Sequence, residues 1–155
     1  MFESSPSSRQ VDTTQNPLAV CLDGSPYQFY VDTVPNSSAH FFGWVLFFEG
    51  GGWCYSPADC LKRSRTYLGS SRNMSQTLTP TKMPLQWFEA EGPLSSDRVG
   101  NPLFSQYNRA FIKYCDGNSF TGQREEPLQV DGQQLYFRGR YNLEVRLGNA
   151  LPSGF

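Results

Sequence analysis

The chain alternates between short apolar runs and polar, turn-rich stretches, and two of the apolar runs stand out. Residues 44–48 are five consecutive bulky apolar side chains, a pattern typical of a strand buried on both faces, as in a parallel sheet. The run is too short to span a membrane, and its aromatic content disfavours a helix. Residues 110–115 form a second run, so the pattern predicts two buried strands.

One helix and a long irregular stretch are predicted between these strands. Ser56 and Pro57 suit the N-cap and first-turn positions, so we expect a short helix from Ala58 to about Tyr67. The stretch 77–108 carries four prolines and is expected to be mostly irregular.

Smaller elements are predicted near both ends of the chain. Residues 19–21 and 27–31 flank a turn at residues 23–26 and predict an antiparallel hairpin. Residues 134–139 are expected to open a further element, and residues 141–145 to begin an amphipathic helix.

The order strand, helix, strand, with a glycine-containing loop after each strand, predicts the α/β fold class. Ligands of open α/β sheets bind at the carboxyl ends of strands, so we expect the functional site at loops 50–52 and 116–122. We divide the chain into a disordered N-terminal arm at residues 1–17, a domain at residues 18–145 and a tail at residues 146–155.

Composition narrows the class of protein and its partners. A length of 155 residues suits one modest domain, and 15% aromatic with 17% charged residues is typical of a globular chain. The formal net charge of −1 gives no electrostatic reason to expect nucleic acid or an anionic membrane as a partner. No signal-peptide pattern is visible at the N-terminus. The oligomeric state stays open.

Four cysteines are compatible with two disulfides in any of three pairings. They are Cys21, Cys54, Cys60 and Cys115. With no CxxC pair and His40 as the single histidine, the sequence does not favour a metal site, and no cofactor is expected. Disulfides imply an oxidising compartment, whereas no signal peptide is visible, and we interpret this conflict as a sign of an incomplete N-terminus.

The three consecutive glycines after the first apolar run are the strongest chemical signal. Glycine lets the backbone turn sharply and present N–H groups with no side chain in the way. Such donors at the end of a strand can hold a developing negative charge, as an oxyanion hole does, and we assign this role to Gly51 and Gly52. The alternative is a tight turn that only packs closely.

Four motifs, in this order and spacing, resemble the pectin acetylesterase family, which also includes the Notum carboxylesterases. They are Cys-Leu-Asp-Gly-Ser-Pro (21–26), Glu-Gly-Gly-Gly-Trp-Cys (49–54), Leu-Gly-Ser-Ser (68–71) and Tyr-Cys-Asp-Gly-Asn-Ser-Phe-Thr-Gly (114–122). The similarity runs from about Ala19 to Gly139. It implies an α/β-hydrolase fold, a Ser–Asp–His triad, hydrolysis of acetyl esters on cell-wall pectin or another acetylated polysaccharide, and secretion to the cell wall.

The resemblance also implies the disulfides Cys54–Cys60 and Cys21–Cys115. Four further residues are expected at the substrate pocket, each with an alternative role: Glu49 (orienting the glycine loop, or a solvated carboxylate), Trp53 (a pocket wall, or a core side chain), Asp116 and Ser119 (lining the cleft, or capping their loop).

The triad itself is missing from these residues. The fold carries its nucleophile in a G-x-S-x-G elbow, which does not occur here, and His40 comes too early to be the triad base. We therefore expect an incomplete α/β-hydrolase, truncated before the nucleophile elbow. A catalytically inactive product that binds glycan or protein is the alternative, and a nucleotide-binding domain is disfavoured because no GK[ST] or G-x-G-x-x-G context is present.

Overall fold

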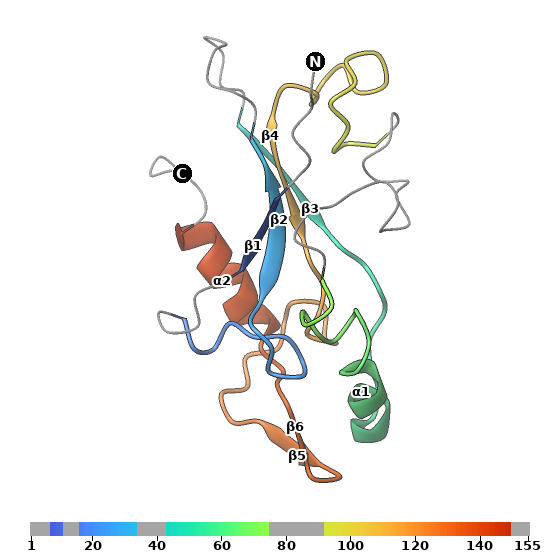
Figure 1. Cartoon of the computed structure of the whole chain (residues 1–155), viewed down its shortest axis with the longest axis vertical. Helices are drawn as coiled ribbons and strands as arrows, with labels where there is room; N and C mark the ends of the chain where they lie inside the picture. Colours follow the sequence, from blue (N-terminus) through green and yellow to red (C-terminus); the bar gives the residue numbers. More distant parts are fainter. Residues whose placement is uncertain (1–6, 11–15, 34–42, 75–91, 150–155) are drawn as a thin grey trace. The chain divides into compact units, whose positions relative to one another are not determined.

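The structure is a computed structural model of the chain, and it describes residues 7–10, 16–33, 43–74 and 92–149 (Figure 1). The chain divides into two compact units. Unit 1 comprises residues 1–9, 29–49 and 75–113, and unit 2 comprises residues 10–28, 50–74 and 114–155. Neither described helix is long and apolar enough to cross a membrane.

A four-stranded sheet with the strand order β1-β2-β4-β3 lies almost entirely in unit 1. Its strands are β1 (Ser7–Gln10), β2 (Gln28–Asp32), β3 (Trp44–Phe48) and β4 (Asn108–Ile112). β3 and β4 are parallel, with Trp44 opposite Asn108 and Phe48 opposite Ile112, whereas β2 runs antiparallel to β4. The strand predicted at residues 44–48 is confirmed, and the one predicted at residues 110–115 is observed at residues 108–112, in a mixed sheet.

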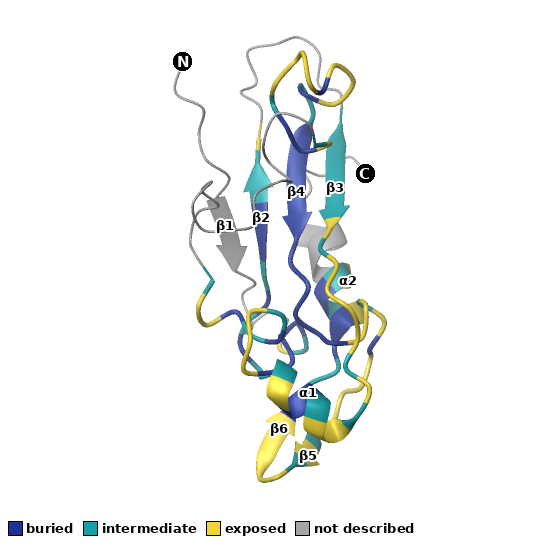
Figure 2. Cartoon of the chain, turned by 90° about the vertical axis from the view of Figure 1, so that its right-hand side faces the viewer, coloured by how far each residue is buried: buried dark blue, intermediate teal, exposed yellow. Residues whose placement is uncertain are grey.

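The two parallel strands differ in burial (Figure 2). β4 is buried at all five positions, while β3 is only partly buried and its Phe48 is 46% exposed. β3 ends the strand order and β4 lies inside it, so β3 has a strand partner on one side only within the described sheet. The prediction that residues 44–48 are buried on both faces is therefore wrong, and β4 is the fully buried strand.

Two predictions for the N-terminal part need correction. Residues 7–10 form strand β1 beside β2, so the disordered arm predicted for residues 1–17 does not extend over them. The predicted hairpin reduces to an isolated antiparallel bridge between Val20 and Pro26, because the second run forms β2 and pairs with β4 instead.

Helix α1 (Pro57–Arg63) starts where the sequence predicts. The Ser56 hydroxyl caps it by accepting a hydrogen bond from the backbone N–H of Asp59 at 3.2 Å. The helix ends before Tyr67 because hydroxyl groups compete for its last carbonyls, and Thr66 donates to the carbonyl of Arg63 at 2.8 Å.

A hairpin of β5 (Leu128–Val130) and β6 (Gln133–Leu135) precedes helix α2 (Gly139–Asn149). Its turn, Asp131-Gly132, has φ values of 48° and 76°, as a two-residue turn with both residues left-handed requires. This Asp-Gly dipeptide is the signal that sequence reasoning missed.

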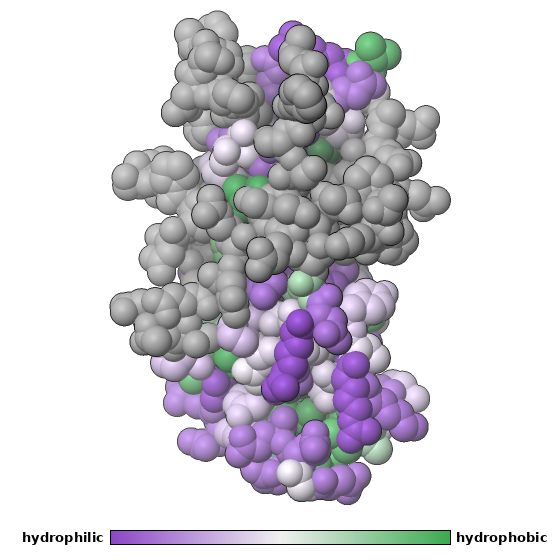
Figure 3. Space-filling view, viewed as in Figure 1, coloured by the Kyte–Doolittle hydropathy of each residue, from purple (hydrophilic) through white to green (hydrophobic). Residues whose placement is uncertain are grey.

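A small apolar core joins helix α1 to this hairpin in unit 2. It consists of Leu22, Cys60, Leu61 and Leu135. Figure 3 shows hydrophilic side chains over much of the described surface on the face viewed, with hydrophobic side chains among them.

Candidate active site

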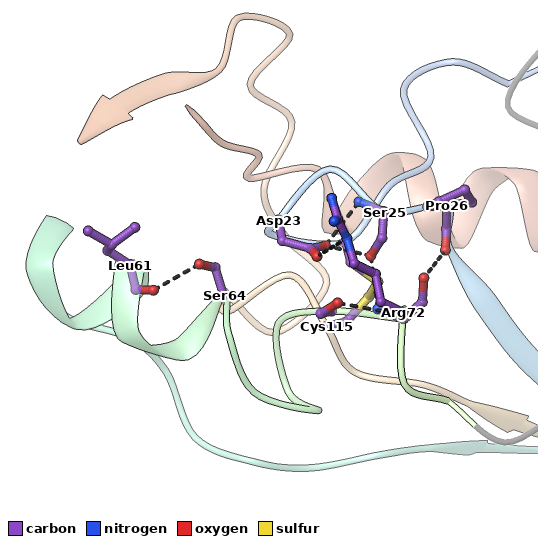
Figure 4. Close-up of polar contacts among 10 residues, drawn as sticks. Asp23, Ser25, Pro26, Leu61, Ser64, Arg72 and Cys115 are labelled. Carbon is purple, nitrogen blue, oxygen red and sulfur yellow. Dashed lines mark hydrogen bonds and ion pairs between the residues drawn. A yellow bond between two sulfur atoms is a disulfide. The ribbon is translucent and has the colours of Figure 1, made fainter. Parts of the chain in front are cut away.

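Three of the four family-like motifs lie against one another in unit 2. The Asp23 carboxylate pairs with Arg72 at 3.2 Å, and the Ser25 hydroxyl accepts a hydrogen bond from the Ser71 N–H at 2.8 Å (Figure 4). The Leu22 N–H donates to the carbonyl of Cys115 at 2.7 Å. Segments 21–26, 68–72 and 114–122 therefore form one scaffold.

Both disulfides implied by the resemblance are confirmed. Cys21–Cys115 spans 94 residues of sequence and fastens two of these segments together. Cys54–Cys60 spans six residues and ties the end of the glycine loop to helix α1. Because the Cys54 N–H also donates to the carbonyl of Gly117 at 3.1 Å, the glycine loop is held to the loop that follows Cys115.

The carbonyl oxygens of the glycine loop are tethered on one side. Nη2 of Arg63 donates to the carbonyls of Gly51 at 2.6 Å and Gly52 at 2.7 Å, and the Tyr114 hydroxyl donates to the Gly52 carbonyl at 2.8 Å. In a trans peptide the N–H points opposite to the carbonyl of the same plane. The two tethered carbonyls therefore direct the N–H groups of Gly52 and Trp53 away from Arg63.

These N–H groups are available to a ligand. Within the residues that the structure describes, the backbone N–H groups of Gly51, Gly52 and Trp53 donate to no protein acceptor, and all three residues are exposed. Aligned backbone N–H groups without acceptors can bind an anion or stabilise an oxyanion. The sequence pointed to Gly51 and Gly52, and the geometry adds the N–H of Trp53.

Glycine is favoured at two loop positions for different reasons. A Cβ on Gly51 would lie 2.8 Å from Leu68 Cδ2 and 3.1 Å from Tyr114 Cδ1, so a side chain there requires the end of Leu68 to shift. Gly52 has a φ of 68°, in the left-handed region, where other residues are strained. A Cβ on Gly50 would meet nothing within 4 Å, so this position is open.

Asp116 lies inside its loop and is fully buried. Its Oδ2 accepts hydrogen bonds from the N–H groups of Asn118 at 3.2 Å and Phe120 at 3.0 Å. Burial raises the pKa of the Asp116 carboxyl to about 6, against the opposing effects of these hydrogen bonds and of Arg63. Asp116 therefore caps its loop, which is one of the two roles expected from the sequence, and its place in the substrate cleft stays a prediction.

The side chains of Trp53 and Ser119 contact each other, while their place in a substrate pocket stays a prediction. The Trp53 indole N–H donates to the Ser119 hydroxyl, and Trp53 is 70% exposed, which excludes the alternative of a core side chain. Ser119 and Phe120 have φ values of 49° and 60°, and the Ser119 N–H donates to the Tyr114 hydroxyl at 3.0 Å. Trp53 directly follows Gly52, so its exposed indole comes from the residue next to the glycine loop in the chain.

Glu49 belongs to unit 1, whereas the other candidate site residues belong to unit 2. Its carboxylate forms a buried ion pair with Lys113 at 2.6 Å, between the residues that follow β3 and β4. Burial lowers the pKa of Lys113, and the Glu49 charge opposes that effect. The alternative of a solvated carboxylate is therefore wrong, while the orienting of the glycine loop by Glu49 stays a prediction.

Two residues that hydrogen-bond to the glycine loop, Arg63 and Tyr114, were not singled out from the sequence as site residues. Tyr114 directly precedes Cys115 in a family-like motif, whereas nothing in the sequence distinguishes Arg63 from the other basic residues near the end of α1. Among the described residues no group of three His, Cys, Asp or Glu side chains is arranged to hold a metal ion. His40 lies outside the described residues.

Comparisons with curated proteins find plant esterases and Notum enzymes. Pectin acetylesterase 5 of Arabidopsis thaliana is 37% identical over 138 residues, which cover 88% of this chain and 29% of that protein. Pectin acetylesterase 4 of the same plant is 36% identical over 142 residues, covering 88% and 30%. The human palmitoleoyl-protein carboxylesterase Notum is 34% identical over 109 residues, covering 69% and 19%. The chain thus spans less than a third of the length of these relatives.

The fold is shared with a solved structure. The Wnt deacylase Notum from Drosophila superimposes with a TM-score of 0.72 at 26% identity, over 91% of this chain and 36% of that one. The model of the family described as pectinacetylesterase matches residues 4–153, a range wider on both sides than the boundaries 18–145 drawn from the sequence. The chain therefore belongs to the pectinacetylesterase family.

Proposed function

We propose that this chain carries the oxyanion-binding part of a carboxylic ester hydrolase that removes acetyl groups from cell-wall pectin. The observation that carries the proposal is the glycine loop, whose carbonyls are tethered while its N–H groups have no described protein acceptor. Family membership supports the ester-hydrolase chemistry, and the plant relatives named pectin acetylesterases support acetylated pectin, or a similar acetylated polysaccharide, as the substrate.

The mechanism we propose is acyl transfer through a serine. A serine hydroxyl gives its proton to a general base and attacks the acetyl carbonyl, and the resulting tetrahedral oxyanion accepts hydrogen bonds from the glycine-loop N–H groups. Collapse of this intermediate breaks the C–O bond to the sugar, which leaves with the proton as a free hydroxyl, and water then hydrolyses the acetyl-serine to acetate and free serine. Removing one such donor typically raises the barrier by about 2.7–4 kcal/mol. The 155 residues contain no G-x-S-x-G motif, so the proposed nucleophile is not among them.

The exposed indole of Trp53 is the proposed wall of the substrate pocket. Its N–H is already bound to Ser119, so the ring is held in place while its surface remains exposed. An aromatic ring of this kind offers the apolar C–H face of a sugar, or the acetyl methyl group, a contact surface. Both disulfides support an oxidising compartment, and we propose secretion to the cell wall.

The experiment is acetate release by the full-length gene product, expressed under oxidising conditions. We expect hydrolysis of acetylated pectin and of a small aryl acetate. If neither substrate releases acetate, the proposal that the protein is an esterase is wrong. If only the aryl acetate is hydrolysed, the esterase activity stands and pectin is rejected as its substrate.

A glycan-binding product without turnover is the second candidate. Three exposed aromatic residues of unit 2 favour it: Trp53 at 70%, Tyr55 at 88% and Tyr67 at 62% exposure. This candidate expects the 155-residue chain to bind acetylated pectin in a pull-down assay without releasing acetate. Absence of binding by a cooperatively folded chain rejects it.

A further inference from the structure

We propose that Arg63 and Tyr114 are positioning residues for the ester hydrolysis, because they hold the glycine loop by its carbonyls and so aim its N–H groups at the reacting ester. The inference rests on the proposed function. Neither side chain is expected to touch the substrate, since both act on the far side of the peptide planes.

The contacts fix two successive peptide planes. One Arg63 nitrogen bridges the carbonyls of Gly51 and Gly52 at 2.6 and 2.7 Å, and the Tyr114 hydroxyl adds a third bond at 2.8 Å. A planar trans peptide cannot turn its N–H without turning its carbonyl, so the N–H groups of Gly52 and Trp53 are fixed as well. A left-handed glycine on a surface loop would otherwise sample many conformations.

The Arg63 side chain, which holds the loop carbonyls, is itself held in place. The Arg63 guanidinium lies over the Tyr114 ring at 5.2 Å from the centroid, a favourable cation–π contact. Arg63 ends helix α1, and the Cys54–Cys60 disulfide ties that helix to the end of the glycine loop. Helix α1 is therefore connected to the glycine loop twice, through the disulfide at Cys60 and through the hydrogen bonds of Arg63. The positive charge at the carbonyl end also polarises the peptides, which strengthens their N–H groups as donors.

The test compares Arg63→Gln, Arg63→Lys and Tyr114→Phe in the full-length gene product with aryl acetate as substrate. The matched control is Arg65→Gln, an exposed arginine just beyond the same helix. Displaced oxyanion donors weaken transition-state binding more than substrate binding. We expect Arg63→Gln to lower kcat about 30- to 100-fold with KM changed less than about twofold, Tyr114→Phe to lower kcat about tenfold, and Arg63→Lys to recover part of the loss.

A second readout separates positioning from folding. A boronate that forms a tetrahedral adduct should lose affinity for Arg63→Gln in parallel with kcat, while all variants keep a cooperative thermal transition and both disulfides by mass. The inference is overturned if Arg63→Gln keeps kcat within about threefold of Arg65→Gln, or if its loss appears only as a raised KM or a lost thermal transition. A wild-type protein that hydrolyses no ester instead rejects the proposed function.

Discussion

The indole N–H of Trp53 donates to the hydroxyl of Ser119, a residue 66 positions further along the chain. The same two loops are joined by the Cys54 N–H, which donates to the Gly117 carbonyl, and by the Tyr114 hydroxyl, which donates to Gly52 and accepts from Ser119. The glycine loop and the loop after Cys115 therefore behave as one structural element. A change in either loop is expected to reach the N–H groups of the other.

Removing the Ser119 hydroxyl should disturb Trp53 more than it disturbs folding. Trp53 is exposed, so the lost hydrogen bond is expected to cost less than about 1 kcal/mol of unfolding free energy in Ser119→Ala. Release of the indole should nevertheless change its fluorescence and lower kcat/KM for acetylated pectin. Thr121→Ala removes an exposed hydroxyl of the same loop that donates to the Asn118 carbonyl, and it serves as the control. Identical substrate kinetics for Ser119→Ala and wild type would show that the indole does not need this anchor.

Substitutions at neighbouring glycines should differ sharply. In Gly51→Ala the added methyl group meets the end of the Leu68 side chain and the Tyr114 ring, so Leu68 or the loop must shift, and we expect a loss of about 1–3 kcal/mol in stability and a fall in kcat of up to about 100-fold. Gly50→Ala meets nothing within 4 Å and should stay close to wild type. Thermal unfolding and aryl acetate kinetics measure both. Equal effects of the two substitutions would contradict the close packing at Gly51.

The sequence predicted the chemistry of the site better than the contacts that hold it. The glycine loop, the N-cap Ser56 and the strands at residues 44–48 and 110–115 follow from local signals: conformational freedom, capping and apolar runs. The roles of Glu49 and Asp116 depend on partners distant in sequence. Lys113 reaches Glu49 only because β3 and β4 pair in parallel, and a local pattern does not contain that information.

The strand pairing shows the same limit. An antiparallel hairpin was expected around residues 23–26 because adjacent runs often pair. In the structure, β2 pairs instead with β4, which begins about eighty residues later. Arg63 is a second example, since its identity as a loop clamp depends on where α1 places its last turn against Gly51.

The two disulfides should contribute differently to stability and activity. A chain-entropy estimate gives about 5 kcal/mol for the 94-residue separation of Cys21–Cys115 and about 2 kcal/mol for the six-residue separation of Cys54–Cys60. We therefore expect the Cys21→Ser/Cys115→Ser protein to show the larger loss of unfolding free energy in urea. The Cys54→Ser/Cys60→Ser protein should lose less stability but more kcat than its stability loss explains, because α1 then no longer fixes the glycine loop. The reverse order in urea would contradict the entropy argument.

The buried ion pair of unit 1 should be sensitive to losing one partner. Glu49→Gln leaves the Lys113 ammonium buried without its counter-charge, and breaking such a pair typically costs about 3–5 kcal/mol. The double variant Glu49→Gln/Lys113→Met removes both charges and should regain much of that loss. Urea unfolding of wild type, Glu49→Gln, Lys113→Met and the double variant measures the coupling, and additive effects of the two substitutions would show that the pair contributes nothing.

The raised pKa of Asp116 predicts a particular dependence of stability on pH. The pKa of Asp116 is about 6 in the folded protein, whereas an aspartate in an unfolded chain has a pKa of about 3.9. Between these values the folded state binds the proton and the unfolded state does not, so stability should fall as pH rises from about 4 to about 6. The difference between the two pKa values corresponds to about 3 kcal/mol of unfolding free energy. The folded protein has this extra stability below about pH 4 and has lost it above about pH 6.

Asp116→Asn tests this because the amide oxygen can still accept the N–H groups of Asn118 and Phe120 without titrating. We expect the stability of wild type relative to Asp116→Asn to decline through that pH window, while Asp131→Asn, at an exposed hairpin turn, leaves the profile of wild type unchanged. Urea midpoints at half-unit pH steps measure the slope. A raised pKa of Asp116 makes wild type lose stability relative to Asp116→Asn as pH rises. Parallel profiles for the two proteins would therefore mean that Asp116 ionises as freely in the folded loop as in the unfolded chain.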